Sequence, residues 1–223
     1  MTAVSRETIR PVVARRAVPR TEERVLPAAR RAADRMLAEH LARYRFVAPT
    51  LRGRVLDLGC GTGYGALELS RQEGVREVLG VDRSAEALAW ARRYYPDSKI
   101  VLEPVDVEVR DWHAALGPFD GIVAFEILEH LADESALWLG IRRALNPDGV
   151  LWMSTPVGQG RGISASDPFH VHQLRRSEFE ETLRAGGWEV AIFGQTGMWI
   201  EPWVAGRRYR TILARARAKA GAA

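Results

Sequence analysis

The stretch Val55-Leu56-Asp57-Leu58-Gly59-Cys60-Gly61-Thr62-Gly63-Tyr64-Gly65 decides how this chain folds. Mainly apolar residues form its first part, as in a buried strand, and alternating glycines follow at once. Glycines at this point allow a backbone with positive φ and let a ligand come close to the main chain. We therefore predict a strand that ends in a ligand-binding turn and leads into a helix.

Strand and helix patterns alternate on the C-terminal side of this turn. The expected strands cover residues 54–58, 77–81, 99–102, 119–125, 150–154, 188–193 and 209–214. The expected helices cover residues 66–72, 84–94 with Ser84 as N-cap, 134–145 and 177–185, and Asn146 to Gly149 predict a turn. This alternation indicates an α/β fold with a buried, mainly parallel sheet and helices on both faces. Ligands of such sheets bind at the carboxyl ends of the strands.

The 223 residues suit one such domain with an N-terminal extension. We expect a disordered basic tail over residues 1–20, a helical cap over 21–50 and the ligand-binding domain over 51–216. Residues 1–45 hold eleven Arg and five acidic residues, whereas the remainder holds 21 basic and 23 acidic residues. Because the body of the chain is close to neutral, its net charge of +4 is weak support for a nucleic-acid partner.

The sequence also bears on location. It contains no run of about 18 apolar residues and no secretory signal, so we expect no membrane partner. The single cysteine, Cys60, cannot form an internal disulfide, which fits a reducing cytoplasm. The use of 30 arginines against two lysines is typical of a GC-rich bacterial genome.

Two classes of cofactor compete for the glycine turn. Gly61 to Ala66 fit the loose dinucleotide pattern G-x-G-x-x-G/A. However, Asp57 stands near the end of the preceding strand, where its charge would repel a pyrophosphate but attract an ammonium and a sulfonium. We therefore favour S-adenosylmethionine (SAM). Asp82 follows the second strand, so it can accept hydrogen bonds from the ribose hydroxyls, cap the next helix or do both. Arg83 is expected either over the adenine or in solvent.

The chain is similar to a known family in several motifs at once. Val55–Gly65, Val81-Asp82, Pro104–Asp106, Phe119–Leu131 and Leu145–Pro156 resemble the motifs of class I SAM-dependent methyltransferases, above all the group of ubiquinone-biosynthesis O-methyltransferases. The resemblance covers about residues 40–195. It implies a doubly wound, Rossmann-like, mostly parallel seven-stranded sheet with one antiparallel strand. It also implies an enzyme that moves a methyl group from SAM to an oxygen or nitrogen of a small-molecule acceptor.

The resemblance further implies roles for individual residues. Asp106 would bind the adenine amino group and the Val107 amide a ring nitrogen, with Glu108 as an alternative to Asp106. Phe125 and Glu126 would lie beside the methionine part of the cofactor. A helix with His40, Arg43 and Tyr44 would cover it or serve ordinary packing. The expected cofactor-binding residues are Tyr44, Asp57, Gly59, Cys60, Gly61, Gly63, Asp82, Arg83, Asp106, Val107 and Phe125.

An acceptor hydroxyl or ammonium must lose a proton, so a general base near the fourth strand is expected. His130 is the first candidate because Glu126 or Glu129 can tune its pKa, although it would also suit simple packing. His170 and His172 follow the fifth strand in a Gly- and Ser-rich loop, either to bind or deprotonate the acceptor or as incidental surface residues. The expected catalytic residues are Glu126, His130, His170 and His172.

Other interpretations stay open. Glu126, Glu129 and His130, with His170 or His172, resemble the metal site of RNA 2′-O-methyltransferases that modify small-RNA 3′ ends. Yet Glu-x-x-Glu-His is common in the wider family without metal, and residues 157–168 lack the RNA-family pattern, so we assign no metal. A non-catalytic SAM-binding module and a NAD-dependent oxidoreductase are further alternatives. Trp199 and Trp203 would line an acceptor pocket, the core or the interface of a homodimer.

Overall fold

The computed structural model describes residues 32–162 and 170–219. The expected tail over 1–20 and the beginning of the expected cap, 21–31, lie outside the described residues. The helices are α1 Ala32–Val47, η1 Ala48–Thr50, α2 Tyr64–Ser70, α3 Ala85–Tyr94, η2 Leu128–His130, α4 Ser135–Ala144 and α5 Arg176–Ala185. The strands are β1 Gly53–Leu58, β2 Val75–Asp82, β3 Ile100–Pro104, β4 Phe119–Phe125, β5 Leu145–Pro156, β6 Trp188–Thr196, β7 Trp199–Pro202 and β8 Thr211–Ala218.

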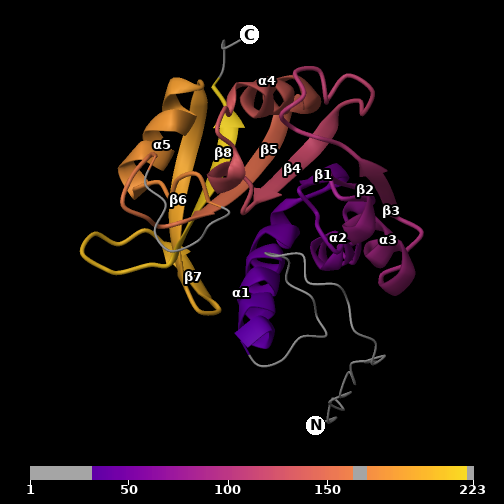
Figure 1. The fold of residues 1–223 in the computed structure, drawn as a ribbon, viewed down its shortest axis with the longest axis horizontal. Helices are drawn as coiled ribbons and strands as arrows, with labels where there is room; N and C mark the ends of the chain where they lie inside the picture. Colours follow the sequence, from indigo (N-terminus) through magenta and orange to yellow (C-terminus); the bar gives the residue numbers. More distant parts are fainter. Residues whose placement is uncertain (1–31, 163–169, 220–223) are drawn as a thin grey trace.

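The strands form one sheet in the order β3-β2-β1-β4-β5-β8-β6-β7 (Figure 1). β1 to β5 pair in parallel, β8 is antiparallel to both β5 and β6, and β7 is antiparallel to β6. The predicted doubly wound, mostly parallel α/β fold is confirmed. The described sheet has eight strands rather than the expected seven, because the residues around Trp199 form the short strand β7.

Alternate residues of the central strands face two hydrophobic layers, as the twofold periodicity of a strand requires. On one face, Leu56 and Ile122 pack with residues of α4 and α5 such as Ile141 and Phe179. On the other face, Val55 and Val123 pack with α1 and α2. Figure 1 shows α4 and α5 in the upper part of the view and α1 to α3 in the lower part. This layering leaves the carboxyl ends of β1, β4 and β5 as the edge where side chains can meet a ligand.

Local signals in the sequence fix several boundaries. The expected N-cap is confirmed, because the Ser84 side chain accepts a hydrogen bond from the amide of Ala87 at the start of α3. The expected turn at Asn146 to Gly149 needs correction, since these residues lie within β5 as an irregularity in its pairing with β4. Phe119 pairs with Leu145 and Gly121 with Val150, so one residue of β4 opposes four of β5. The turn-forming residues bulge out of the strand without ending it.

Helix α1 lies against α2 through a contact that only glycine allows. A Cβ added to Gly65 would lie 2.1 Å from Cζ of Tyr44, so the ring of Tyr44 occupies the space where any other residue would have a side chain. Tyr44 is 5% exposed and its ring packs edge-on against Phe125, with 5.0 Å between the ring centroids. The contact therefore fixes α1 over the carboxyl ends of β1 and β4.

We predict that Gly65→Ala destabilises the domain and weakens ligand binding, because the methyl group displaces Tyr44. Alanine is otherwise about 1 kcal/mol better than glycine inside a helix, so without this contact the same change would be neutral or stabilising. Thermal unfolding and isothermal titration with S-adenosylhomocysteine measure both effects. In a Tyr44→Ala background the penalty should disappear. A stabilised Gly65→Ala single variant would show that α1 does not pack as described.

Candidate functional site

The glycine turn after β1 is shaped by its own backbone. Gly59, Gly61 and Gly63 have φ values of 74°, 53° and 85°, a region that residues with a Cβ rarely adopt. The amides of Gly59 and Cys60 donate to the carbonyl of Val81, which fixes the turn to the end of β2. A Cβ at Gly61 would meet nothing within 4 Å, so this position borders open space. The predicted turn after the first strand is thus confirmed, and at Gly61 its main chain borders open space.

Asp57 is the buried acid of this turn, at 0% exposure. Its Oδ1 accepts a hydrogen bond of 3.0 Å from the Tyr44 hydroxyl, whereas its Oδ2 is buried and finds no donor among the described residues. Burial raises the pKa of Asp57 to about 7; the Tyr44 hydrogen bond opposes this shift and the charge of Asp82 adds to it. An ammonium group supplies both the missing donor and the opposite charge, whereas a pyrophosphate would add to the repulsion.

Asp82 connects the turn to the start of α3. Its Oδ2 accepts from the Gly61 amide at 2.9 Å, and its Oδ1 accepts from the Ser84 amide at 2.8 Å. Each carboxylate oxygen can accept a second hydrogen bond, so the carboxylate can shape the loop and still bind two ribose hydroxyls. Asp82 thus supports the approach to α3, whose N-cap is Ser84, and its binding of the ribose stays a prediction.

The expected adenine-binding residues are more open. Arg83 is exposed and lies 3.6 Å from Glu108 in an ion pair. Asp106 is also exposed, and its Oδ1 accepts a 3.0 Å hydrogen bond from the Glu108 amide, whereas Val107 is buried. A cavity of about 570 Å³ against β2 and β3 includes Asp106 in its lining but none of the other expected cofactor-binding residues. Asp57 and the glycines lie outside it, so this cavity brings together only one of the expected cofactor-binding residues.

Helix α1 brings a buried cation to the same edge. Arg43 is 2% exposed, and its Nη1 donates to Gln195 Oε1 at 3.0 Å and to Thr211 Oγ1 at 3.2 Å. The Nε and Nη2 atoms have no acceptor among the described residues. Its Nη1 also lies 3.8 Å from Oε1 of Glu126. A guanidinium with unused donors inside a protein is suited to a carboxylate, which accepts two parallel hydrogen bonds from it.

His40 and Tyr64 form a second contact under α1. Nδ1 of His40 lies 2.7 Å from the Tyr64 hydroxyl. Burial and the nearby charge of Arg43 lower the pKa of His40 to about 4, against a smaller opposite effect of Glu126. His40 is therefore neutral near pH 7 and adds no charge to the site.

Two glutamates at the end of β4 have opposite electrostatic environments. Glu126 has a φ of 52°, the only positive φ outside glycine in the described ranges, and its Oε1 accepts from Ser154 at 2.7 Å. Burial opposes its ionisation, but chiefly the charge of Arg43, with the hydrogen bond from Ser154, lowers the pKa of Glu126 below its ordinary value. Burial and the charge of Glu126 raise the pKa of Glu129 well above the ordinary value. Such a difference between neighbouring carboxyls is typical of functional sites.

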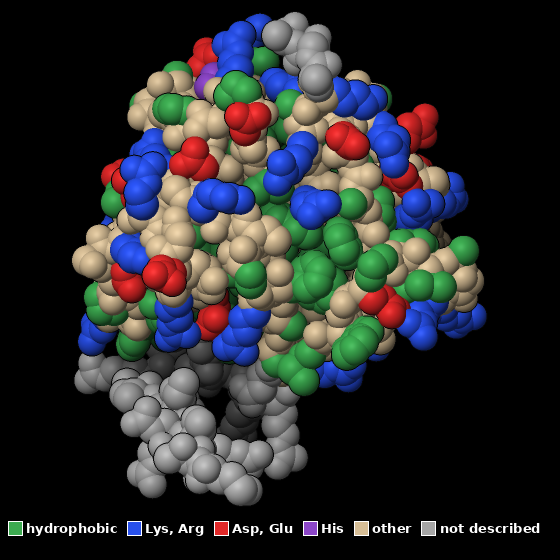
Figure 2. Space-filling view, turned by 180° about the vertical axis from the view of Figure 1, so that it is seen from behind, with side chains coloured by type: hydrophobic (Ala, Val, Ile, Leu, Met, Phe, Trp, Pro, Cys, Tyr) green, Lys and Arg blue, Asp and Glu red, His purple; other side chains and the backbone are tan. Residues whose placement is uncertain are grey.

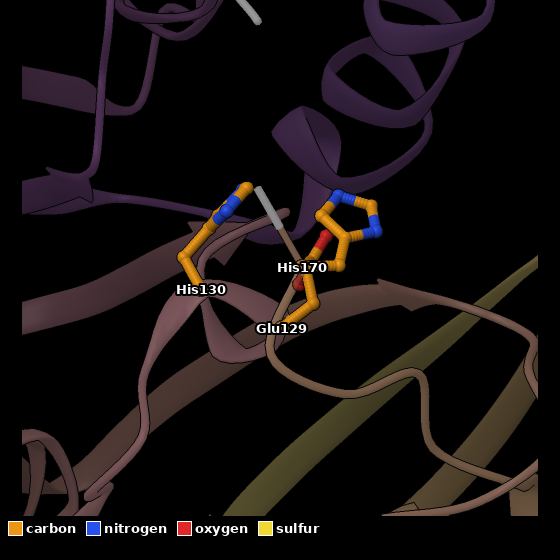
Figure 3. Close-up of side chains that lie close together, drawn as sticks. All are labelled: Glu129, His130 and His170. Carbon is orange, nitrogen blue, oxygen red and sulfur yellow. The ribbon is translucent and has the colours of Figure 1, made fainter. Parts of the chain in front are cut away.

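His130 and His170 complete this group, as Figure 3 shows. One possible ligand atom from each of Glu129, His130 and His170 lies within 4.8 Å of those of the other two, and the imidazole centroids are 5.0 Å apart. His172 lies elsewhere: it is 4% exposed, with Nε2 at 3.4 Å from Oε1 of Glu134. His170 and His172 are separated by one residue, but their side chains lie in different environments. We therefore leave His172 out of the group near the acceptor.

Comparison with known proteins identifies the family of this architecture. A family model described as a methyltransferase domain matches residues 28–191. The chain belongs to this methyltransferase family.

Named relatives connect the methyltransferase to SAM. A probable S-adenosylmethionine-dependent methyltransferase of Mycolicibacterium smegmatis is 32% identical over 184 residues, 78% of this chain and 66% of the relative. A ubiquinone biosynthesis O-methyltransferase of Xanthomonas oryzae is 27% identical over 165 residues, 67% of each chain. The match thus spans about two thirds or less of the length of these curated relatives, 66% and 56% for the two mycobacterial ones. SAM is the cofactor of this domain.

Solved structures support the fold. The crystal structure of the small RNA methyltransferase HEN1 superposes with a TM-score of 0.65 at 18% identity, over 83% of this chain and 26% of that one. At this level of identity the likeness concerns the architecture of the methyltransferase domain and not its substrate.

Sequence reasoning alone overlooked part of this site. It included Asp57 and Glu126, but it did not include two hydroxyl residues of β5. Ser154 donates a hydrogen bond to Glu126, and Thr155 donates one to Glu129. Glu129 entered only as a residue that can tune the pKa of His130 and as a ligand in the metal alternative. Neutral hydroxyl residues inside a strand carry no signal of their own, and only the pairing of β4 with β5 reveals their partners.

We predict that cofactor affinity depends on pH through Asp57. Because the cationic cofactor favours ionised Asp57, affinity should fall about tenfold for each pH unit below 7, with release of one proton on binding, and become constant above 7, where no proton is released. Titration calorimetry in two buffers of different ionisation enthalpy measures both. Since the pKa is raised on folding, the free protein should also lose stability as the pH rises from about 4 to 7.

The matched variant is Asp57→Asn, which should bind the cofactor more weakly and with no such pH dependence. If the wild-type and Asp57→Asn methyltransferases show the same pH profile, Asp57 is not the titrating group.

We predict that Asp82→Ala weakens S-adenosylhomocysteine binding at least tenfold, since two hydrogen bonds to a charged acceptor are lost, worth about 1.5–3 kcal/mol. A 2′-deoxy analogue separates this effect from loop shaping. It should bind the wild type less well than the parent ligand, while Asp82→Ala should barely discriminate between the two. Equal discrimination by both proteins would limit Asp82 to its contacts with Gly61 and Ser84.

Proposed function

We propose that this domain transfers the methyl group of SAM to an oxygen or nitrogen of a small-molecule acceptor. The observation that carries the proposal is the buried polar group at the carboxyl ends of β4 and β5. Glu129 is 0% exposed, Arg43 is 2% exposed, and α1 contacts this edge of the sheet through Tyr44 and Arg43. An acceptor that reaches these side chains must fit beneath a helix, which favours a small molecule over a macromolecule.

The residues divide the work between two ends of the site. At one end, the free oxygen of Asp57 would receive the cofactor's ammonium, and Asp82 would hold the ribose. The unused nitrogens of Arg43 suit a carboxylate, either that of the cofactor or one on the acceptor. When bound, SAM supplies a methyl group on a sulfonium, which an acceptor atom must approach in line with the departing sulfur.

The other end would prepare the acceptor. An oxygen or ammonium nitrogen must lose a proton, and His130 or His170, which lie close together beside Glu129, would accept it. Glu126 would be held ionised by Arg43 and Ser154, and its strained backbone keeps the carboxylate at the strand end. The relatives named ubiquinone biosynthesis O-methyltransferases are consistent with an oxygen acceptor.

The charge distribution also favours a small acceptor over RNA. Acidic side chains are scattered among basic ones on the face that Figure 2 shows, and residues 46–223 are close to neutral. An RNA-binding surface needs clustered basic residues. The one observation that favours the RNA alternative is the group of Glu129, His130 and His170 at distances suited to a metal ion. The RNA acceptor is therefore kept as a separate arm of the experiment.

We extend the proposal to the location of the reaction. Within residues 32–162 and 170–219, no helix is both long and apolar enough to cross a bilayer. Cys60 is buried and carries a free thiol, which fits the reducing cytoplasm.

The test is transfer of label from methyl-labelled SAM. The full chain is incubated with a low-molecular-mass metabolite fraction or with a total RNA fraction, and labelled products are separated by mass. We expect label in a small molecule and S-adenosylhomocysteine in equal amount, with Asp57→Asn largely inactive as the control. Label confined to nuclease-sensitive material would support the RNA alternative. Tight SAM binding without label in either fraction would support a non-catalytic module.

A further inference from the structure

We propose that three side chains behind the candidate proton acceptors, His130 and His170, hold these two histidines in place relative to each other. The three are Glu134, Arg161 and His172. None of them would touch the acceptor, so each would be a positioning residue. The proposal rests on the proposed function only in the role that it gives to His130 and His170.

The two histidines come from parts of the chain that are distant in sequence. His130 ends the short helix η2, whereas His170 lies in a stretch without helix or strand before α5. Their rings are nevertheless close, with 5.0 Å between the centroids (Figure 3). Since no regular element carries His170, tertiary contacts must fix its position.

The ring of His172 contacts the chain on both sides of His130. It is 4% exposed, and the main chain of Leu128, at the start of η2, forms a hydrogen bond with it. Its Nε2 makes no hydrogen bond with a described residue but lies 3.4 Å from Oε1 of Glu134, the N-cap residue of α4. The segment that begins at His170 is therefore anchored around the turn that carries the other histidine.

Arg161 contacts the same carboxylate. Glu134 is 8% exposed, its Oε2 accepts a 3.0 Å hydrogen bond from Trp138 Nε1, and its Oε1 pairs with the guanidinium of Arg161. The main-chain amide of Arg161 donates to Oε1 of Glu178, in the first turn of α5, at 3.3 Å. Arg161 is thus connected to the starts of two helices, α4 and α5.

The backbone joins the stretch with Arg161 to the stretch with His172. The amide of Gly160 donates to the carbonyl of Gln173 at 2.9 Å, and these two residues form an isolated antiparallel bridge. Each is a direct neighbour of Arg161 or His172 in the sequence. Because the Glu134 carboxylate contacts both of these side chains, one buried acid attaches the two stretches to the start of α4.

These contacts specify a geometry more than they add stability. A buried ion pair stabilises a fold little compared with well-packed apolar residues, because desolvation of the charges opposes their attraction. It does restrict where its partners lie, and the amide of Val171 adds a 2.9 Å hydrogen bond to the carbonyl of Glu129. A general base must lie within hydrogen-bond reach of its proton, and a displacement of about 1 Å can lower a rate about a hundredfold. We therefore expect an effect on methyl transfer more than on cofactor binding.

The test observes the two rings directly in the full chain, with labelled histidine rings and no methyl donor. In the wild type we expect a nuclear Overhauser effect between the imidazole protons of His130 and His170, assigned with His130→Asn and His170→Asn. Arg161→Met, Glu134→Gln and His172→Phe should each lose this effect, because each removes a polar contact while roughly keeping the size of the side chain.

The matched control is Arg184→Met. The side chain of Arg184 is 49% exposed and pairs with Glu180, as that of Arg161 is 46% exposed and pairs with Glu134. Arg184→Met should keep the effect between the rings, and so should Arg161→Lys, which retains the charge. A ring contact that is unchanged in all three test variants, or absent from the wild type, would overturn the proposal.

Methyl transfer gives the second measurement, with the acceptor identified by the labelling experiment. Arg161→Met should lower kcat about tenfold or more, while Tm and the affinity for S-adenosylhomocysteine stay as in the wild type. Parallel losses of stability, cofactor affinity and kcat would show a merely structural role and contradict the proposal. Arg161→Met, changed at the surface, serves where a buried variant fails to fold, as circular dichroism would show.

The two proposals fail separately. The ring measurement contains no methyl donor, so its failure leaves the proposed methyl transfer standing. Absence of methyl transfer, in turn, leaves the measured arrangement of the rings standing.

Discussion

The burial of the Asp57 carboxyl is the constraint on which the rest of the site depends. A carboxylate taken out of water without a partner is costly, and here only one of its two oxygens is satisfied, by Tyr44. That hydrogen bond requires α1 to lie over the strand ends, and α1 can lie there only because Gly65 leaves room for the Tyr44 ring. One buried acid, one tyrosine and one glycine thus connect the glycine turn to the helix that covers it.

The same edge carries further buried charge, balanced only in part. Arg43 stabilises the ionised form of Glu126, while Glu129, deeper and next to Glu126, favours its protonated form. A domain selected for stability alone would gain by replacing such groups with apolar residues, as measurements on buried ion pairs show. Polar atoms without a hydrogen-bond partner among the described residues lie at one end of the sheet, on Asp57, Glu129 and Arg43. Because buried polar atoms normally find partners, we interpret these as positions that a ligand would contact.

What the sequence could predict follows from the range of the interactions involved. The apolar runs of the central strands, the glycine turn and the Ser84 cap are local features, and the structure confirms them. Strand β7 and the bulge at Asn146 to Gly149 were missed because each depends on pairing with a strand distant in sequence. The separation of His170 from His172 has a similar origin. Their shared motif suggests a common role, but the contact of His172 with Glu134 from the start of α4 is tertiary.

Sheet topology also sets the distance between the two ends of the site. β1, β4 and β5 are adjacent, with Asp57 opposite Val123 and Phe125 opposite Ser154. Neighbouring strands are about 4.8 Å apart, so the acid at the end of β1 is roughly 5–10 Å from the groups held at the ends of β4 and β5. An ammonium at Asp57 on β1 and an acceptor near Glu129, which lies in η2 just after β4, would thereby be held apart by one rigid sheet. In the proposed reaction the strand order, more than any single side chain, would hold donor and acceptor at a fixed separation, and such positioning is a large part of catalysis in a displacement reaction.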